Sequence, residues 1–254
     1  MASQSHAALV RINPGHTGRR AALTLAAITA ASLAAAGCGG GGGSGSDPLS
    51  GMSGKQVVAK AVADLQAAKS FTMKGDVNQS GQKLGIDLGY LKGKGCSGTV
   101  SEGDKGSITL VVIGTTAWVK PSDEFLKSTA GSQASAAIAL LNGRYLKGST
   151  SDSTVASLTT VCDVNQMTSS FTQTGTLVKG KVTTVGGQQV LPITDKTKGG
   201  TMNVTNTATP QIVSITNATG TGGSTGQLAF NVGAPVTLTP PPASQSVDGS
   251  SLGF

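Results

Sequence analysis

Side chains that commonly carry out chemistry are scarce in this sequence of 254 residues. Its only histidines, His6 and His16, lie near the N-terminus, and its three cysteines are Cys38, Cys96 and Cys162. Without histidine in the rest of the chain, Ser-His-Asp catalysis, Cys-His catalysis and histidine-based zinc sites are excluded there. The cysteines are therefore the first residues to interpret.

Cys38 ends a segment typical of an exported protein. Arg19 and Arg20 precede an uncharged, alanine-rich stretch, Ala21–Ala36, that is shorter than the roughly 20 residues of a membrane span. A basic start followed by a short apolar stretch is the pattern of a signal peptide. The four residues that end at Cys38, Ala-Ala-Gly-Cys, resemble the bacterial lipobox, in which the cysteine is lipidated and becomes the mature N-terminus. Alanine here takes the place of the leucine that this motif prefers.

We therefore predict a lipoprotein signal peptide over residues 1–37, lipidation of Cys38 and a Gly/Ser-rich tether over residues 38–52. The lipid would hold the protein at the outer face of the cytoplasmic membrane, after export by the general secretory or the twin-arginine route. The alternative is an ordinary secretory peptide that is cleaved near the same alanines, with Cys38 incidental.

Cys96 and Cys162 are the other two cysteines, and an exported chain meets a compartment in which disulfides form. Their spacing is not the CxxC of a redox motif. We therefore predict a structural disulfide, which by chain entropy would stabilise the fold by about 4 kcal/mol. The competing interpretation is a pair of reactive thiols.

Two further motifs do not indicate a site of chemistry. Residues 93–98 match GxGxxG, but a dinucleotide site needs that loop between a strand and a helix, and here strands are expected on both sides. Asp123 and Glu124 are adjacent carboxylates, which at a helix start favour the helix dipole and do not face each other. We therefore expect no catalytic residues, no metal, no cofactor and no enzyme activity.

The net charge of +7 does not indicate a nucleic-acid-binding protein. Arg11, Arg19 and Arg20 lie in the predicted signal peptide, and the remaining charges are spread singly along the chain. Nucleic-acid binding requires clustered cations, often with stacking aromatic residues, and aromatic residues are only 3% of this sequence. We therefore expect no nucleic-acid partner.

Hydrophobic periodicity predicts the elements that position these residues. A helix with Ser53 as its N-cap is expected to run to about Lys69, because apolar residues recur on one face. The period then changes to two, with tight turns between the runs. Ten strands are expected, over residues 71–77, 83–90, 95–101, 108–113, 115–120, 177–185, 189–194, 202–207, 211–217 and 228–232. Helices are expected over 122–142 and 153–171.

The order of these elements predicts an α+β fold. We expect a single curved antiparallel sheet, a half-barrel of about ten strands, whose concave face is covered by the N-terminal helix and the middle helices. This domain would extend over residues 53–239 and would be followed by an extended or loose Pro/Ser-rich tail over 240–254.

This layout resembles the LppX/LprG group of actinobacterial lipoproteins, which share a LolA/LolB-like half-barrel. The resemblance rests on the lipobox-like Cys38, the helix that ends in Lys69-Ser70-Phe71, the segment Thr115–Lys120 and the segment Gly143–Lys147. It implies an unclosed barrel that holds acyl chains between the sheet and the helices. It does not by itself establish that this chain binds them.

Three functions therefore compete, and the third, a histidine-free hydrolase, would need carboxylates that converge in a cleft. The first is a lipid-anchored envelope protein that binds a hydrophobic ligand, most simply a lipid, for carriage or sensing. The second is a non-enzymatic interaction or structural protein with a solid core, no ligand and an unknown protein partner. The first hypothesis makes candidates of the apolar residues expected to face the cavity: Val58, Val62, Leu65, Phe71, Met73, Leu84, Ile86, Leu88, Ile108, Leu110, Val112 and Trp118.

Overall fold

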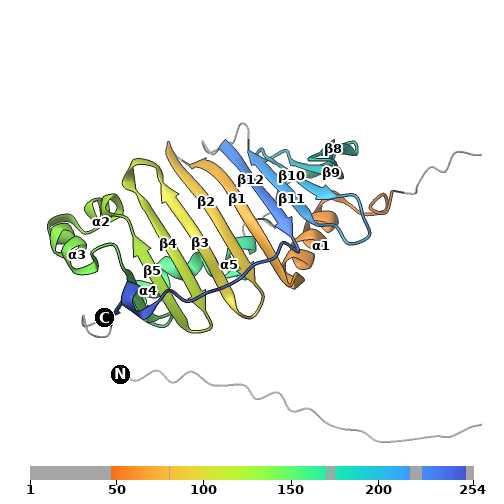
Figure 1. Ribbon diagram of the computed structural model, residues 1–254. Coiled ribbons are helices and arrows are strands. Elements are labelled where there is room, and N and C mark those ends of the chain that lie inside the picture. The colour runs from red at the N-terminus through yellow and green to blue at the C-terminus, as the bar shows by residue number, and fades with distance from the viewer. Residues whose placement is uncertain (1–46, 80, 170, 172–174, 218–224, 250–254) are drawn as a thin grey trace, which may run out of the picture. The chain divides into compact units, whose positions relative to one another are not determined.

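The computed structural model describes residues 47–249 except 80, 170, 172–174 and 218–224 (Figure 1). The predicted signal peptide, Cys38 and most of the predicted tether lie outside the described residues. The described residues belong to a compact unit that runs from Gly45 to Phe254.

The core of this unit is an open sheet of 13 strands. The strands follow the order β13-β6-β5-β4-β3-β2-β1-β12-β11-β10-β9-β7, with β8 also paired to β9. Every pairing is antiparallel except that of β13 with β6. The strands are β1 Ser70–Gln79, β2 Gln82–Leu91, β3 Gly95–Glu102, β4 Ser107–Ile113, β5 Thr116–Pro121, β6 Tyr145–Ser149, β7 Leu177–Lys179, β8 Thr183–Val185, β9 Gln188–Asp195, β10 Thr201–Thr205, β11 Ile212–Asn217, β12 Thr225–Val232 and β13 Ser246–Asp248.

Among the described residues, one longer helix precedes the first strand and shorter helices follow later strands. They are α1 Gly54–Ala67, η1 Gly103–Lys105, α2 Asp123–Thr129, η2 Gly131–Gln133, α3 Ala134–Leu141, α4 Ser153–Thr159, η3 Thr160–Cys162, α5 Val164–Ser169 and η5 Ala243–Gln245. The predicted α+β class with one open, curved and mostly antiparallel sheet is confirmed. The strand number exceeds the expected ten because β6 and β13 were not anticipated and the strand expected over 177–185 is two strands.

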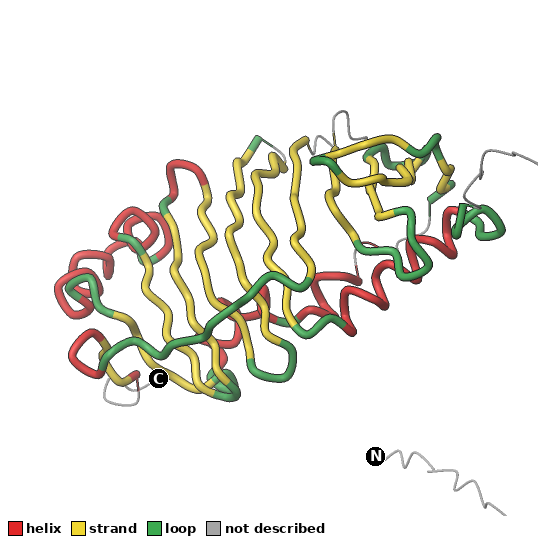
Figure 2. The backbone as a smooth tube through the Cα atoms, turned by 45° about the vertical axis from the view of Figure 1, so that its right-hand side comes forward, coloured by secondary structure: helices red, strands yellow, loops and turns green. Residues whose placement is uncertain are grey.

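Helix α1 covers one face of the sheet, which we call the helix face, together with α4, η3 and α5 (Figure 2). As predicted, Ser53 is its N-cap: the Ser53 hydroxyl accepts from the Gln56 amide, and the Gln56 side chain accepts from the Ser53 amide. This capping box satisfies two backbone donors that a helix start leaves free. The residues that α1 buries are Gly54, Val57, Val58, Ala61, Val62 and Leu65.

The expectation that all the middle helices cover the helix face is wrong for α2 and α3. They lie at the end of the sheet near β4 and β5, where α2 packs on η1 and β4, and α3 packs on α2 (Figure 1). The reason is local: α2 begins directly after β5, where the Ser122 hydroxyl accepts from the amides of Phe125 and Ser107. This cap ties the start of the helix to the start of β4 and directs it away from the sheet.

Both ends of the described chain join the fold more closely than the sequence suggested. Leu49, which we assigned to the tether, is 1% exposed and belongs to the hydrophobic core. At the other end, the chain after β12 crosses the opposite face of the sheet, which we call the outer face, and leads into the segment expected to be a loose tail (Figure 1). A Cβ atom on Gly89 would meet Val236 there, and β13 then pairs with the edge strand β6. Backbone hydrogen bonds on an otherwise open edge explain why this tail is ordered.

Candidate functional site

An apolar pocket of about 290 Å³ lies between the sheet and the η3–α5 segment. Strand alternation and antiparallel register bring its sheet residues to one face, with Met73 opposite Leu88 and Ile86 opposite Val100. The sheet lines it with Met73, Leu84, Ile86, Leu88, Tyr90 and Val100, and the helix layer with Thr160, Val161, Gln166 and Met167.

A second pocket, of about 610 Å³, lies on the other side of Tyr90. Its walls come from the C-terminal end of α1, the turn between β2 and β3, and the α4–η3–α5 segment. The lining is mixed, because Gln66, Lys92 and Asn165 contribute beside the apolar Phe71 and Val112. Thr160 and Gln166, like Tyr90, line both pockets, so the two spaces adjoin.

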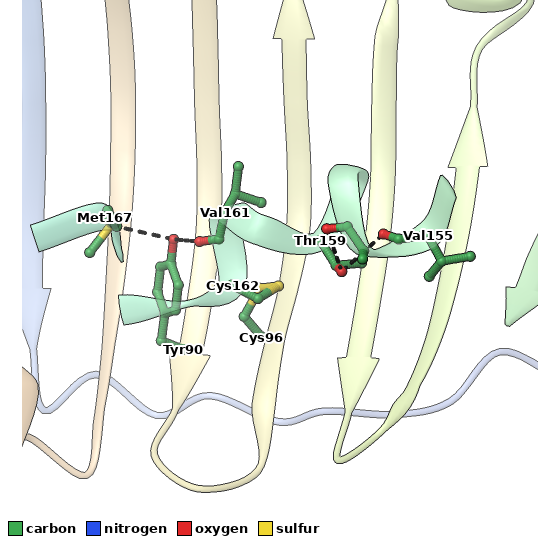
Figure 3. The surroundings of a disulfide bond; sticks show 8 residues. Tyr90, Cys96, Val155, Thr159, Val161, Cys162 and Met167 are labelled. Carbon is green, nitrogen blue, oxygen red and sulfur yellow. Dashed lines mark hydrogen bonds between the residues drawn. A yellow bond between two sulfur atoms is a disulfide. The ribbon is translucent and has the colours of Figure 1, made fainter. Parts of the chain in front are cut away.

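A strap of residues 160–167 crosses the sheet between these two pockets (Figure 3). The disulfide between Cys96 of β3 and Cys162 of η3 joins the strap to the sheet, with a Cα–Cα distance of 5.5 Å. This confirms the predicted bridge. Beside it, the Tyr90 hydroxyl donates to the Val161 carbonyl oxygen at 2.8 Å and lies 3.6 Å from the Met167 sulfur. Covalent and polar contacts together therefore hold the strap over β2 and β3.

Tyr90 is neutral at physiological pH. Burial raises the pKa of its phenol well above the usual value, because the interior disfavours the phenolate. Its ring stacks on Phe71 at 4.4 Å between centroids, and Phe71, Phe230 and Phe171 continue the aromatic cluster along the helix face. The hydroxyl is thus a fixed hydrogen-bond donor at the junction of the two pockets.

The structure distributes the predicted cavity residues over three pockets and the core. Met73, Leu84, Ile86 and Leu88 line the apolar pocket, as the alternation suggested. The second pocket contains Leu65, Phe71 and Val112. A third, of about 300 Å³ between α1 and strands β9–β11, contains Val58. Val62 and Leu110 are buried in the core, and Ile108 is half-buried on the helix face.

The prediction that Trp118 faces the cavity is wrong. In the β4–β5 register it lies opposite Val111, whereas Leu110 and Val112 lie opposite Val119 and Ala117. Because successive residues of a strand point to opposite faces, Trp118 and Val111 lie on the outer face. Trp118 therefore does not line any space between the sheet and the helices.

Sequence reasoning missed six of the residues that line the apolar pocket: Tyr90, Val100, Thr160, Val161, Gln166 and Met167. Tyr90 and Val100 continue the alternation of their strands and could have been found by extending it to the strand ends. Val161 and Met167 come from the strap, and only the proximity of the strap to β3, which the disulfide provides, places them over the sheet.

The other motifs provide no chemistry. Residues 93–98 form the β2–β3 turn and the start of β3, with no helix following. Glu124 lies in the first turn of α2, where its own backbone amide and the Ser122 hydroxyl lower the pKa of its carboxyl. Within residues 47–249, outside the gaps noted above, no group of three or more His, Cys, Asp or Glu side chains could hold a metal ion.

An open, mostly antiparallel sheet with helices on one face is the half-barrel fold that the sequence resemblance implied. The structure is similar to that of LprF from Mycobacterium bovis, with a TM-score of 0.50, 12% identity, and coverage of 74% of this chain and 96% of that chain. It also resembles the Mycobacterium tuberculosis lipoprotein LppX, with a TM-score of 0.46, 13% identity, and coverage of 73% and 98%. At such identity the likeness to LprF shows a shared fold.

The sequence itself offers no nearer relationship. No family model matches the chain, and no curated protein matches it in sequence. In the part of the chain that the structure describes, no helix is both long and apolar enough to cross a membrane.

Proposed function

We propose that this chain is a lipid-anchored lipoprotein of the cell envelope that binds an apolar ligand, the acyl chain of a lipid, without catalysing a reaction. The observation that carries the proposal is the apolar pocket between β1–β3 and the strap. The volume of this pocket, about 290 Å³, is just below the roughly 300–1,000 Å³ typical of ligand sites, which suits one acyl chain better than several. Transfer of the acyl chain from water into the pocket would contribute a binding free energy of about 25 cal/mol per Å² of buried apolar area.

The adjoining pocket supports an amphiphilic ligand. Gln66, Lys92 and Asn165 offer amide and ammonium groups next to the apolar space, where a polar headgroup could be hydrogen-bonded. Tyr90 lines both pockets. A lipid with its acyl chain in one pocket and its headgroup in the other would therefore lie against the Tyr90 hydroxyl. Such a protein needs no nucleophile or metal, since binding and release are its whole activity.

Fluorescence titration with cis-parinaric acid tests this function on the chain from Gly45 to Phe254. We expect saturable binding, and we expect Ile86→Trp to weaken it by roughly tenfold or more, because the indole would occupy the pocket. The matched control is Ile113→Trp, since Ile113 is also half-buried but lies on the outer face. Absence of saturable binding by the parent protein would favour the solid-core interaction protein, and equal binding by both variants, with unchanged circular dichroism, would exclude the apolar pocket as the binding site.

Lipidation is tested separately in the exporting cell. We expect the full-length protein to partition with membranes and Cys38→Ala to reduce that partition strongly. Native mass spectrometry of the exported chain would detect any retained lipid as added mass. Unchanged membrane partition of Cys38→Ala would contradict the anchor while leaving the ligand pocket to its own test.

A further inference from the structure

The sheet edge farthest from β13 carries four lysines and one carboxylate. It comprises β7, β8 and the turn between β9 and β10, and we call it the basic edge. Backbone hydrogen bonds from Gly180 to Pro192 and from Lys196 to Thr176 hold these segments side by side. Its defining residues are Val178, Lys179, Lys181, Val182, Lys196 and Lys198.

This edge has a net positive charge. Residues 47–254 contain 16 basic and 12 acidic side chains, a net charge of +4, whereas residues 175–200 contain four lysines and one aspartate. That aspartate, Asp195, accepts from the backbone amides of Thr197 and Lys198. The ion pairs found among the described residues include neither Lys181 nor Lys196, and both are exposed.

Exposed apolar side chains accompany these cations. Among the described residues, the large hydrophobic side chains most exposed to solvent are Leu140, Val178 and Val182, and two of the three lie on the basic edge. Val178 is 42% and Val182 is 38% exposed. Lysines beside exposed valines match a surface that is anionic outside and apolar beneath, as a phospholipid bilayer is.

The chain enters the folded unit at the same edge. The Lys179 ammonium donates to the carbonyl oxygens of Leu49 and Ser50 at 2.9 and 3.0 Å, which ties the start of the fold to β7. From Cys38 to Asp47 the chain can span at most roughly 30 Å even when fully extended. A lipid on Cys38 would therefore keep the basic edge close to the membrane that holds it.

We propose that the basic edge is a membrane-contact surface that binds anionic phospholipid headgroups, with Lys181 and Lys196 as its principal cations. It forms a second attachment besides the proposed lipid on Cys38 and orients the sheet with β7 toward the bilayer and β13 away from it. The proposal uses the lipid anchor for the orientation alone, and the binding itself is a property of the folded unit.

Vesicle sedimentation tests the surface with the chain from Gly45 to Phe254, which contains the whole core. We expect binding to vesicles of phosphatidylcholine with phosphatidylglycerol, and little to phosphatidylcholine alone. Lys181→Ala with Lys196→Ala should lower the partition coefficient by roughly 25-fold, or about fivefold per lysine. The matched control removes the same charge elsewhere, as Lys69→Ala with Lys127→Ala, and should change it less than twofold.

Three results would overturn the proposal. One is absence of binding to the anionic vesicles at low salt. Another is an equal loss in both double variants, which would show that net charge alone attracts the domain. The third is unchanged vesicle binding together with self-association of the Lys181 and Lys196 variant, which would show that these lysines only protect an edge strand from pairing. Parinaric acid binding, measured on the same samples, keeps failure of the ligand pocket distinguishable.

The single tryptophan tests the orientation. Trp118 on β5 lies eight strand spacings from β9, roughly 38 Å along the sheet. On vesicles that contain brominated lipid we expect no quenching of Trp118, and quenching of the new indole in Val182→Trp combined with Trp118→Phe. The reverse pattern would place the opposite end of the sheet on the membrane and overturn the assignment.

Discussion

Helix α1 and the strap of residues 160–167 cover the same face of the sheet but are held there by different forces. Helix α1 is held by apolar burial, with Val57 and Leu65 at most 1% exposed. The strap is held by the Cys96–Cys162 disulfide and by the Tyr90 hydrogen bond, and it leaves pockets on both sides. A segment attached at a few points can cover a cavity that close apolar packing would fill.

Removal of the disulfide is expected to have the largest effect on the strap. We expect Cys96→Ser with Cys162→Ser to lower the free energy of unfolding by about 4 kcal/mol, because the bridge closes a loop with a sequence separation of 66 residues. Parinaric acid binding should weaken as well, since the strap forms one wall of the apolar pocket. Urea denaturation and fluorescence titration measure the two effects. Intact ligand binding in the folded variant would show that hydrogen bonds alone hold the strap.

A cavity under α1 should affect stability without affecting the ligand. Val57 is fully buried and lines none of the three pockets described above. We expect Val57→Ala to lower the free energy of unfolding by roughly 2 kcal/mol, through lost burial and a residual cavity. Parinaric acid affinity should stay within twofold of the parent protein. A large loss of affinity would show that α1 and the strap are not independent.

Removal of the Tyr90 hydroxyl tests the hydrogen bond that helps to hold the strap on the sheet. We expect Tyr90→Phe to cost about 1.5 kcal/mol, because the Val161 carbonyl loses its donor in a largely buried position. The ring and its stacking on Phe71 would remain. Thermal unfolding measures the loss, and increased hydrogen exchange should be confined to residues 160–167. Exchange that increases equally in α1 would contradict a local role.

The same variant gives a pH prediction. Burial raises the pKa of Tyr90 above its ordinary value of 10.0, so the folded state holds the phenolic proton more tightly than the unfolded state. Its contribution is therefore complete below pH 10 and is lost as the pH rises above that value. We expect Tyr90→Phe to lose less stability than the parent between about pH 10 and pH 11. Parallel loss in both proteins would assign the alkaline effect to other groups.

The smallest expected effect lies at the start of α1. We expect Ser53→Ala to lower the free energy of unfolding by about 1 kcal/mol, because the Gln56 amide loses its acceptor. Helix α1 should fray at its first turn while its buried residues stay in place. Ligand affinity should not change, and Ser53→Asp, which keeps an acceptor, should restore most of the stability.

Prediction from the sequence succeeded where one local pattern was enough. The Ser53 cap, the period-two alternation of Leu84, Ile86 and Leu88, and the pairing of the two remaining cysteines all follow from residue types and spacing. It was wrong for Trp118, because Ala117, Trp118 and Val119 are consecutive apolar residues and either face could be the inner one. Register with β4 selected the face, and a one-residue shift would reverse it.

Residue types and spacing predicted most of the elements, their order and many of the strand residues able to face a ligand, since these depend on contacts between near neighbours in the chain. The tertiary structure alone decided that α2 and α3 lie beyond the sheet end, that the tail closes the β6 edge, and that a strap leaves an apolar pocket. A pocket is space between segments distant in sequence, so its volume depends on how their side chains pack together rather than on any local pattern.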